Sequence, residues 1–182
     1  MLNSKIAKLL AIIFILSGCA NSGVKVDSRV QTSSLPPIKR MLVNINVESR
    51  NFNKNLASGM TNSLVKALNQ CGVSSSIYIK DPLDLNAEQT FANQSKDFNP
   101  DSILTIVRTG GQVLISDGGN NANFDVMMRL SKLAPKSEIW TAKLDVRVLT
   151  QNLFTDDVKS GERLGQQFFE AMKKDRVLCR GD

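Results

Sequence analysis

The sequence predicts an α/β (α+β) two-layer sandwich with a mixed β-sheet and with the helices packed on one face. Several short segments alternate apolar and polar residues, which is typical of half-buried strands. Three longer segments repeat apolar residues every three or four positions, which is typical of amphipathic helices. In chain order these segments read β-α-β-α-β-β-β-α, an order in which helices pack against a sheet.

The first half of this pattern contains two strands and two helices. Residues 38–48 alternate as a strand should, and Leu56, Met60, Leu64 and Leu68 then mark a helix that ends near Gly72. Residues 76–79 form a short apolar strand before Asp81-Pro82. A weaker helical pattern covers residues 85–98 and stops at Asn99-Pro100.

The second half contains three strands and a final helix. Residues 102–108 are an apolar run suited to a central strand, with a continuation through 112–115 left open and a loop over 116–121. Residues 124–130 and 140–148 alternate as two facing strands. The last helix covers about residues 156–175, with acids at its start and Lys173-Lys174 at its end, as the helix dipole favours.

The amino terminus has the pattern of an export signal. Lys5 and Lys8 precede an unbroken apolar run from Leu9 to Leu16. The run is too short to span a bilayer, which needs about 20 apolar residues, but it suits the hydrophobic region of a signal peptide. We therefore expect residues 1–18 to be a signal peptide.

The residues Leu16-Ser17-Gly18-Cys19 resemble the lipobox of bacterial lipoproteins. The resemblance implies that Cys19 is acylated and becomes the new amino terminus, so that its acyl chains hold the protein on a membrane. Ala20 follows the cysteine, and by the same resemblance the outer membrane, facing the periplasm, is the expected location, with surface display left open. The alternative is an ordinary signal peptide with a chance cysteine.

The segment after Cys19 is rich in Ser, Asn, Thr, Gly and Pro and lacks a sustained apolar period. Residues 19–37 are accordingly predicted to be a lipidated amino terminus and flexible tether. Fully extended, that tether would reach on the order of 55 Å. Residues 38–182 are predicted to form a single globular periplasmic domain.

Composition excludes several chemistries. The chain has no histidine, which removes Ser-His-Asp and Cys-His nucleophile activation and the commonest imidazole metal ligand. The net charge of +6 is spread along the chain, so the sequence gives no reason to expect nucleic-acid binding. We expect no cofactor and no metal site, although catalysis by Asp, Glu, Lys or Tyr stays chemically open.

Two cysteines, Cys71 and Cys179, remain in the predicted domain. An exported protein meets an oxidising compartment, so a disulfide between them is the leading interpretation. It requires the end of the first predicted helix to meet the segment just past the last one. Two buried thiols are the main alternative.

Three other motifs have structural interpretations that we prefer. The run Asp117-Gly118-Gly119-Asn120-Asn121 has too few acids at fixed spacing for a calcium site and suits a mobile connection. Gly110-Gly111 precedes no predicted helix, so it is not a phosphate-binding turn. Trp140 lies on the apolar side of its strand and is expected in the core.

The polar sides of the last two strands supply a candidate docking face. Arg129, Lys143 and Arg147 fall there together with Asp125 and Asp145. Cross-strand ion pairing on a solvated face explains these charges without any function. The functional interpretation is a face that docks a protein partner.

The opening strand Ile38-Lys39-Arg40-Met41-Leu42-Val43, the helix end Ala67-Leu68-Asn69-Gln70-Cys71-Gly72 and Glu138-Ile139-Trp140-Thr141-Ala142 resemble a group of envelope lipoprotein domains. The group contains the amino-terminal domain of the Tol-system propeller protein, the lipoprotein activators of penicillin-binding proteins and the periplasmic domain of the curli secretion lipoprotein. The resemblance spans about residues 38–178 and implies a fold, which by itself does not transfer a function.

From these observations we expect a non-enzymatic, membrane-anchored lipoprotein that binds another cell-envelope protein or assembly. One alternative is a carrier of a small apolar ligand or lipid, which would require a sizeable apolar cavity between sheet and helices. Another is an enzyme of unrecognised class, such as a hydrolase that uses carboxylates.

Overall fold

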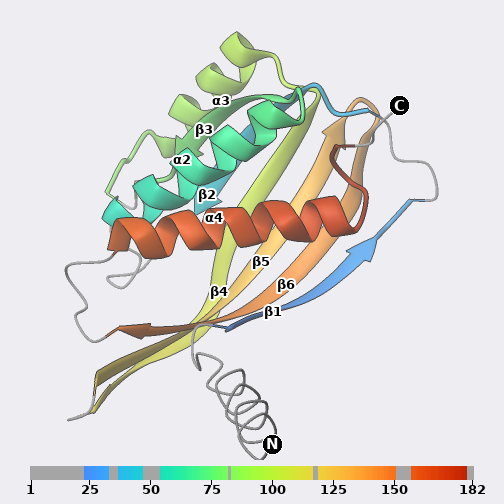
Figure 1. Ribbon diagram of the computed structural model, residues 1–182. Coiled ribbons are helices and arrows are strands. Elements are labelled where there is room, and N and C mark those ends of the chain that lie inside the picture. Colours follow the sequence, from blue (N-terminus) through green and yellow to red (C-terminus); the bar gives the residue numbers. More distant parts are fainter. Residues whose placement is uncertain are drawn as a thin grey trace, which may run out of the picture.

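The computed structural model describes residues 23–32, 37–46, 54–81, 83–116, 119–150 and 157–179, which form a six-stranded sheet with three helices (Figure 1). The strands are β1 (Gly23–Val30), β2 (Arg40–Asn46), β3 (Ser74–Ile79), β4 (Ser102–Ser116), β5 (Gly119–Leu133) and β6 (Lys136–Thr150). The helices are α2 (Lys54–Gln70), α3 (Ala87–Phe98) and α4 (Asp157–Lys174). This confirms the predicted α+β class and the order of the elements from β2 onward.

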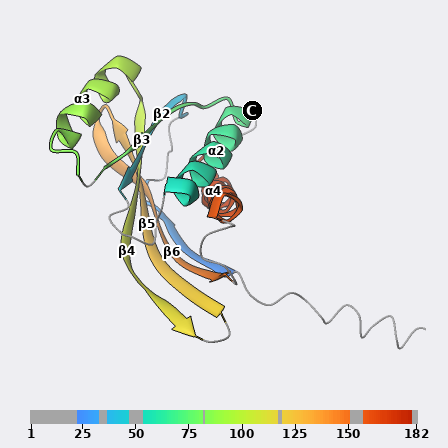
Figure 2. The same cartoon turned by 90° about the vertical axis from the view of Figure 1, so that its left-hand side faces the viewer.

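The sheet is mixed, and its strand order is β1-β6-β5-β4-β2-β3. Strand β2 lies parallel to both β3 and β4, because helical crossovers connect these three strands. The neighbours β4–β5, β5–β6 and β6–β1 are antiparallel. Strands β4, β5 and β6 of the antiparallel half are long, at 15 residues each, and they extend beyond the region that the helices cover (Figure 2).

Helices α2 and α4 lie side by side on one face of the sheet and enclose the hydrophobic core (Figure 1). Trp140 is fully buried, as predicted, and its indole Nε1 donates a hydrogen bond of 2.7 Å to Asp175 Oδ2 just past α4. That bond gives the buried indole N–H an acceptor, without which its burial would cost free energy. The largest fully buried side chains of the core besides Trp140 are Phe168, Met41, Ile45, Met60, Leu64, Leu68, Leu104, Ile106, Met128 and Leu130.

Glycines allow α2 and α4 to approach until their backbones touch. A β-carbon added at Gly59 would overlap the carbonyl oxygen of Val158, and one added at Gly161 would overlap that of Leu56. Gly165 meets the carbonyl oxygen of Met60 in the same way. Glycine inside a helix costs roughly 0.5–1 kcal/mol relative to alanine. Close helix packing is the physical reason for its presence at these positions.

Helix α3 lies on the opposite face of the sheet from α2 and α4, so the prediction that all helices pack on one face was wrong (Figure 2). The hydroxyl of Tyr78 in β3 donates a hydrogen bond of 2.7 Å to Ala87 O, and its ring packs at 5.2 Å from the ring of Phe91. The guanidinium of Arg40 donates to the carbonyl oxygens of Phe98 and Asn99 at the end of α3. The molecule therefore has three layers at the β2–β3 end of the sheet, with α3 on one face and α2 on the other (Figure 2).

Strand order explains why α3 changes sides. In the strand order, β3 lies next to β2 on one side and β4 lies next to β2 on the other. The chain therefore steps in one direction from β2 to β3 and in the opposite direction from β3, past β2, to β4. Crossovers between parallel strands are almost always right-handed. Two crossovers of the same hand that step in opposite directions place their helices on opposite faces. Leu42, fully buried although it lies on the face away from the core of α2 and α4, reflects this second layer.

Strand β1 corrects the predicted tether. The sequence analysis assigned residues 19–37 to a flexible segment, but Gly23–Val30 pair antiparallel with β6 from Gly23 opposite Arg147 to Val30 opposite Trp140. Val24, Val26 and Val30 are spaced at even intervals, which is the strand signal that composition concealed. The sheet thus begins at Gly23 and not at residue 38.

The predicted loop over residues 116–121 is also shorter than expected. Strand β4 continues through Gly110-Gly111 to Ser116, and β5 begins at Gly119. The ladder shifts its register between Arg108 and Gly110, where Thr109 is the extra residue of the strand, and both glycines then pair with β5. A β-carbon at Gly110 would lie 2.8 Å from Asp125 Oδ2, so this position serves close packing within the sheet. Asp117 and Gly118 lie outside the described residues.

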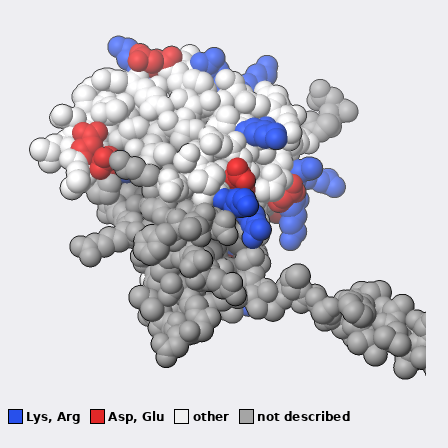
Figure 3. All heavy atoms as spheres, turned by 60° about the vertical axis from the view of Figure 1, so that its left-hand side comes forward, with Lys and Arg blue, Asp and Glu red and all other residues white. Residues whose placement is uncertain are grey.

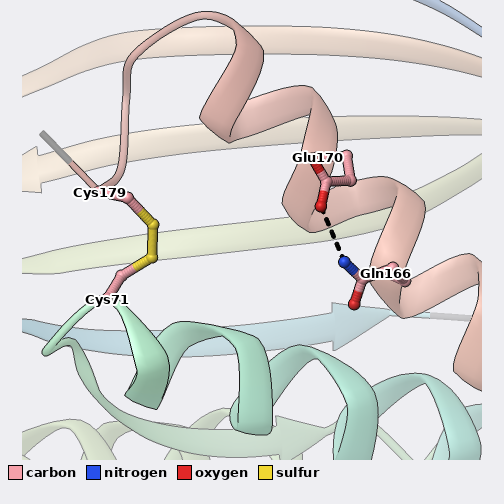
Figure 4. Close-up of a disulfide and its surroundings, with 4 residues drawn as sticks. All are labelled: Cys71, Gln166, Glu170 and Cys179. Carbon is pink, nitrogen blue, oxygen red and sulfur yellow. Dashed lines mark hydrogen bonds between the residues drawn. A yellow bond between two sulfur atoms is a disulfide. The ribbon is translucent and has the colours of Figure 1, made fainter.

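The structure joins Cys71 and Cys179 in a disulfide, as the sequence predicts (Figure 4). Cys71 follows the end of α2, and Cys179 lies past α4, so the bond links the two helical ends. Their α-carbons are 4.9 Å apart, within the usual range for a disulfide. The bond spans a sequence separation of 108 residues, so it restricts most of the unfolded chain.

Replacing Gly161 by alanine should destabilise the protein although alanine favours helix. We expect the Gly161→Ala variant to lose about 1–3 kcal/mol of unfolding free energy, because overpacking outweighs the helix preference of about 1 kcal/mol. Urea unfolding measures the change. Arg163→Ala, at an exposed position on the same helix, is the matched control and should stay within about 0.5 kcal/mol. Equal or greater stability of Gly161→Ala would contradict the close backbone contact.

The packing of α3 predicts an alkaline titration. Burial, with a smaller contribution from the negative charge of Asp84, raises the pKa of Tyr78 above its ordinary 10.0. Between pH 10.0 and the raised pKa of the folded state, Tyr78 keeps its proton when folded and loses it when unfolded. The free energy of unfolding should therefore fall as the pH rises through this range. Tyr78 is the only tyrosine in the chain, so ultraviolet absorbance of tyrosinate follows it directly. A midpoint of about 10 in both native and denatured protein would refute the burial beneath α3.

Candidate functional site

The candidate site is the open sheet face, defined as the face of β4, β5, β6 and β1 that points away from α2 and α4. Alternation assigns side chains to it, because Ala142 and Leu144 are buried in the core while Lys143 between them is exposed. Arg129 in β5 lies on the same face and is also exposed. The structure therefore brings two of the three predicted docking residues onto one surface.

The third predicted docking residue, Arg147, is placed by its backbone alone. It belongs to β6 at the register position opposite Gly23 in β1 and Asn123 in β5. Its side chain lies outside the described part of the structure. Its contribution to the face stays a prediction.

Strand β1 adds three charged residues to this face that the sequence analysis placed in the tether. Asp27 lies opposite Lys143, and Lys25 lies opposite Asp145. Arg29 lies opposite Thr141, which in turn pairs with Arg129. The charged part of the face thus extends over three adjacent strands.

The charges on the open face are mixed in sign, and the ion pair between Arg129 and Glu138 is long and exposed. Arg129 Nε lies 4.0 Å from Glu138 Oε2, with side chains 61% and 43% exposed. Exposed pairs of this kind contribute about 0–1 kcal/mol because water and salt screen them. Asp125 lies directly opposite Asp145 in the ladder, an arrangement that mildly disfavours pairing of the strands. Such side chains can exchange their partners for those of a docked protein at low cost.

An apolar strip adjoins the charged part of the face. Ile103 and Val107 of β4 and Met127 of β5 are half-buried there, and Val107 pairs with Met127 across the strands. A partly exposed apolar centre with a charged border is the composition typical of protein interfaces. Figure 3 is a view in which the open sheet face is turned away, and on the side that it shows basic and acidic side chains are scattered among larger uncharged areas.

A groove lies away from the open sheet face, between the outward side of α2 and strand β3. This groove has a volume of about 810 Å³, opens widely to solvent, and is lined by residues of α2 from Thr61 to Gln70 and by Ile77 and Ile79. It lies outside the hydrophobic core. Among the described residues, a continuous cluster of buried side chains occupies the space between the sheet and helices α2 and α4, where a lipid carrier would need its cavity.

The described ranges contain no group of three or more His, Cys, Asp or Glu side chains that could hold a metal ion. Within the same ranges, no helix is long and apolar enough to cross a membrane. Cys19, Ala20 and the predicted signal peptide lie outside the described residues, so lipidation stays a prediction from the sequence.

Comparison with known proteins identifies no family. No protein-family model matches the chain, and no curated protein matches it. Among solved structures, the PelC dodecamer from Paraburkholderia phytofirmans has a TM-score of 0.49 and 10% identity, covering 78% of this chain and 94% of that one. Lipoprotein GNA1162 from Neisseria meningitidis has a TM-score of 0.47 and 17% identity, covering 78% and 99%. A minor lipoprotein from Acinetobacter baumannii has a TM-score of 0.36 and 11% identity, covering 78% and 96%.

These similarities include bacterial lipoproteins by name. Their sequence identities and TM-scores are too low to assign a family or an activity to this chain. The functional argument therefore depends on the residues of the chain itself.

Proposed function

We propose that this chain is the precursor of a bacterial envelope lipoprotein that binds another envelope protein through the open sheet face. Acyl chains on Cys19 anchor it, with the periplasmic side of the outer membrane as the proposed location. The observation that carries the proposal is the lipobox Leu16-Ser17-Gly18-Cys19 directly upstream of a strand that contributes charged residues to that face.

The position of β1 makes the anchor much shorter than the sequence suggests. Gly23 is the fourth residue after Cys19, which gives a reach of about 14 Å when extended. The domain is consequently held close to the membrane surface and does not stand off by the length of a long tether. Confinement of this kind raises the effective concentration for partners held at the same membrane.

The chemistry of the chain favours binding over turnover. Without histidine the usual routes to an activated nucleophile are missing, whereas docking requires a surface with exposed charges and a partly apolar centre. The open sheet face supplies both: Arg129 and Lys143 are exposed, and Met127 and Val107 lie beside them.

Lipidation predicts the behaviour of a Cys19→Ala variant. The wild-type protein should incorporate labelled palmitate and fractionate with membranes, because several acyl chains make the anchor effectively permanent. The variant should lose both properties while keeping the Cys71–Cys179 disulfide as a sign of correct folding. A Cys19→Ala protein that still fractionates with membranes, together with an unlabelled wild type, would show that the anchor is wrong.

Charge reversal tests the docking face in intact cells that make the full chain. A photo-crosslinking residue at Thr141, on the open face, should capture a discrete partner, whereas the same residue at exposed Gln166 on α4 should not. Reversing Arg129, Lys143 and Arg147 together to Glu should lower capture on the order of tenfold, equivalent to about 1.4 kcal/mol.

The matched control reverses three exposed lysines of the helical layer, Lys66, Lys173 and Lys174, to Glu and should leave capture unchanged. Both triple variants change the net charge by the same amount, so a general charge effect would reduce capture in both. Undiminished capture by the open-face variant would exclude that face as the interface. A robust turnover of substrate by the purified protein would exclude the non-enzyme proposal.

A further inference from the structure

We propose that two copies of this chain pair antiparallel through the outer edges of their β1 strands, with the twofold axis at Ser28. The pairing would join the two sheets into one continuous sheet. It concerns the backbone edge of β1, which borders the open sheet face, and it holds whether or not that face binds a partner.

The two edges of the sheet differ in how they are protected. Strand β3 forms one edge, and the backbone N–H groups of Ser74 and Lys80 bond toward β2, so the carbonyl of Ile77 points outward. Gln94 of α3 donates a hydrogen bond of 2.9 Å to that carbonyl oxygen. Helix α3 thereby caps the β3 edge. Strand β1 forms the other edge, and no described strand lies beyond it.

The hydrogen bonds of β1 determine which of its groups face outward. The backbone N–H of Gln31 donates to Ile139 O at 2.9 Å, so odd-numbered residues of β1 bond toward β6. The N–H and C=O groups of Val24, Val26, Ser28 and Val30 therefore point to the free edge. A row of such groups is a template for pairing with another strand.

The side chains of β1 complement themselves in one register. With the axis at Ser28, Val26 lies opposite Val30 of the second copy, and Asp27 lies opposite Arg29 of the second copy. Both valines are exposed in the single chain, by 39% and 42%. Each contact occurs twice because the interface is isologous. Pairing would cover the exposed valines and form two cross-strand ion pairs.

The neighbouring registers are worse. The backbone N–H and C=O groups of the even-numbered residues point to the free edge, so even-numbered residues must pair with even-numbered residues of the second copy. The twofold axis therefore falls at a residue, such as Asp27 or Ser28, and not between two residues. An axis at Asp27 would oppose two aspartates and would set Lys25 against Arg29, which places like charges in contact. An axis at Val26 would also form two ion pairs, between Asp27 and Lys25, but it would leave Val30 opposite a residue that precedes the strand, so the exposed valines would not cover each other.

Two anchors are compatible with this arrangement. Antiparallel strands with the axis at Ser28 place the two Gly23 residues about 34 Å apart along the strand direction. Both acylated Cys19 residues reach one membrane when the strands lie along its surface, because each link extends about 14 Å. The interface therefore suits two lipid-anchored copies side by side.

Cysteine scanning in the full-length, membrane-bound protein tests the register. Cys71 and Cys179 are joined to each other and Cys19 is the proposed acylation site, so in the lipidated protein an introduced thiol reports on β1. Ser28→Cys should give a reducible dimer under mild oxidation, because residues that face each other across an antiparallel pair lie about 5.5 Å apart, within disulfide range. Val26→Cys and Asp27→Cys place the two thiols out of register and should give at least fivefold less dimer.

The same scan can overturn the proposal. Equal dimer yields from all three variants would indicate random collision, and a dimer from Asp27→Cys or Val26→Cys alone would indicate a different register. Absence of dimer from every variant would exclude the β1 interface. Each of these results contradicts an axis at Ser28.

A charge exchange separates pairing from folding. In the Ser28→Cys background, Asp27→Arg should reduce the dimer at least fivefold, and the double change Asp27→Arg with Arg29→Asp should restore it. Within one chain both variants lose the same Asp27–Lys143 juxtaposition, and Arg29 lies opposite the uncharged Thr141, so the pair between copies is the expected source of the restoration. Failure of the double change to restore the dimer, with the Cys71–Cys179 disulfide still formed, would refute the proposed ion pairs.

Discussion

The backbone contact between α2 and α4 is the constraint on which the rest of the structure depends. Gly59, Gly161 and Gly165 let the two helices approach until carbonyl groups of one meet the α-carbons of the other. The pair then acts as a single layer wide enough to cover β2, β4, β5 and β6, and it buries Trp140 and Phe168. The Cys71–Cys179 bond joins the helical ends that this contact brings together (Figure 4).

The two faces of the sheet consequently have different roles. The face under α2 and α4 is apolar and closed, whereas among the described residues the opposite face is covered where α3 packs at the β2–β3 end. Beyond α3 the long strands carry exposed Arg129 and Lys143. Strand β1 completes this surface and also forms a free edge of the sheet, and it is the strand that follows the predicted lipid anchor in the sequence.

Sequence patterns located most elements from β2 onward, because alternation and helical periodicity are local signals. They also identified Trp140 as a core residue and Cys71 and Cys179 as a pair. They missed β1, because its polar and small residues suggested a tether. A strand at the edge of a sheet has one neighbouring strand, so it can carry such residues and still pair. They shortened β4 and β5, because Gly110, Gly111 and Gly119 suggest breaks unless a bulge and a paired strand accommodate them.

By itself the sequence determined the identity and order of the elements from β2 onward, the oxidised cysteine pair and the prediction of a lipidated Cys19, since each depends on residue type and spacing along the chain. Only the tertiary structure decided which strands are neighbours, and with that the side on which α3 packs and the partners of Arg129, Lys143 and Asp27. The physical reason is that a strand's periodicity specifies which residues point to opposite faces but carries no information about its neighbours. Strand order and register arise from packing the whole sheet at once.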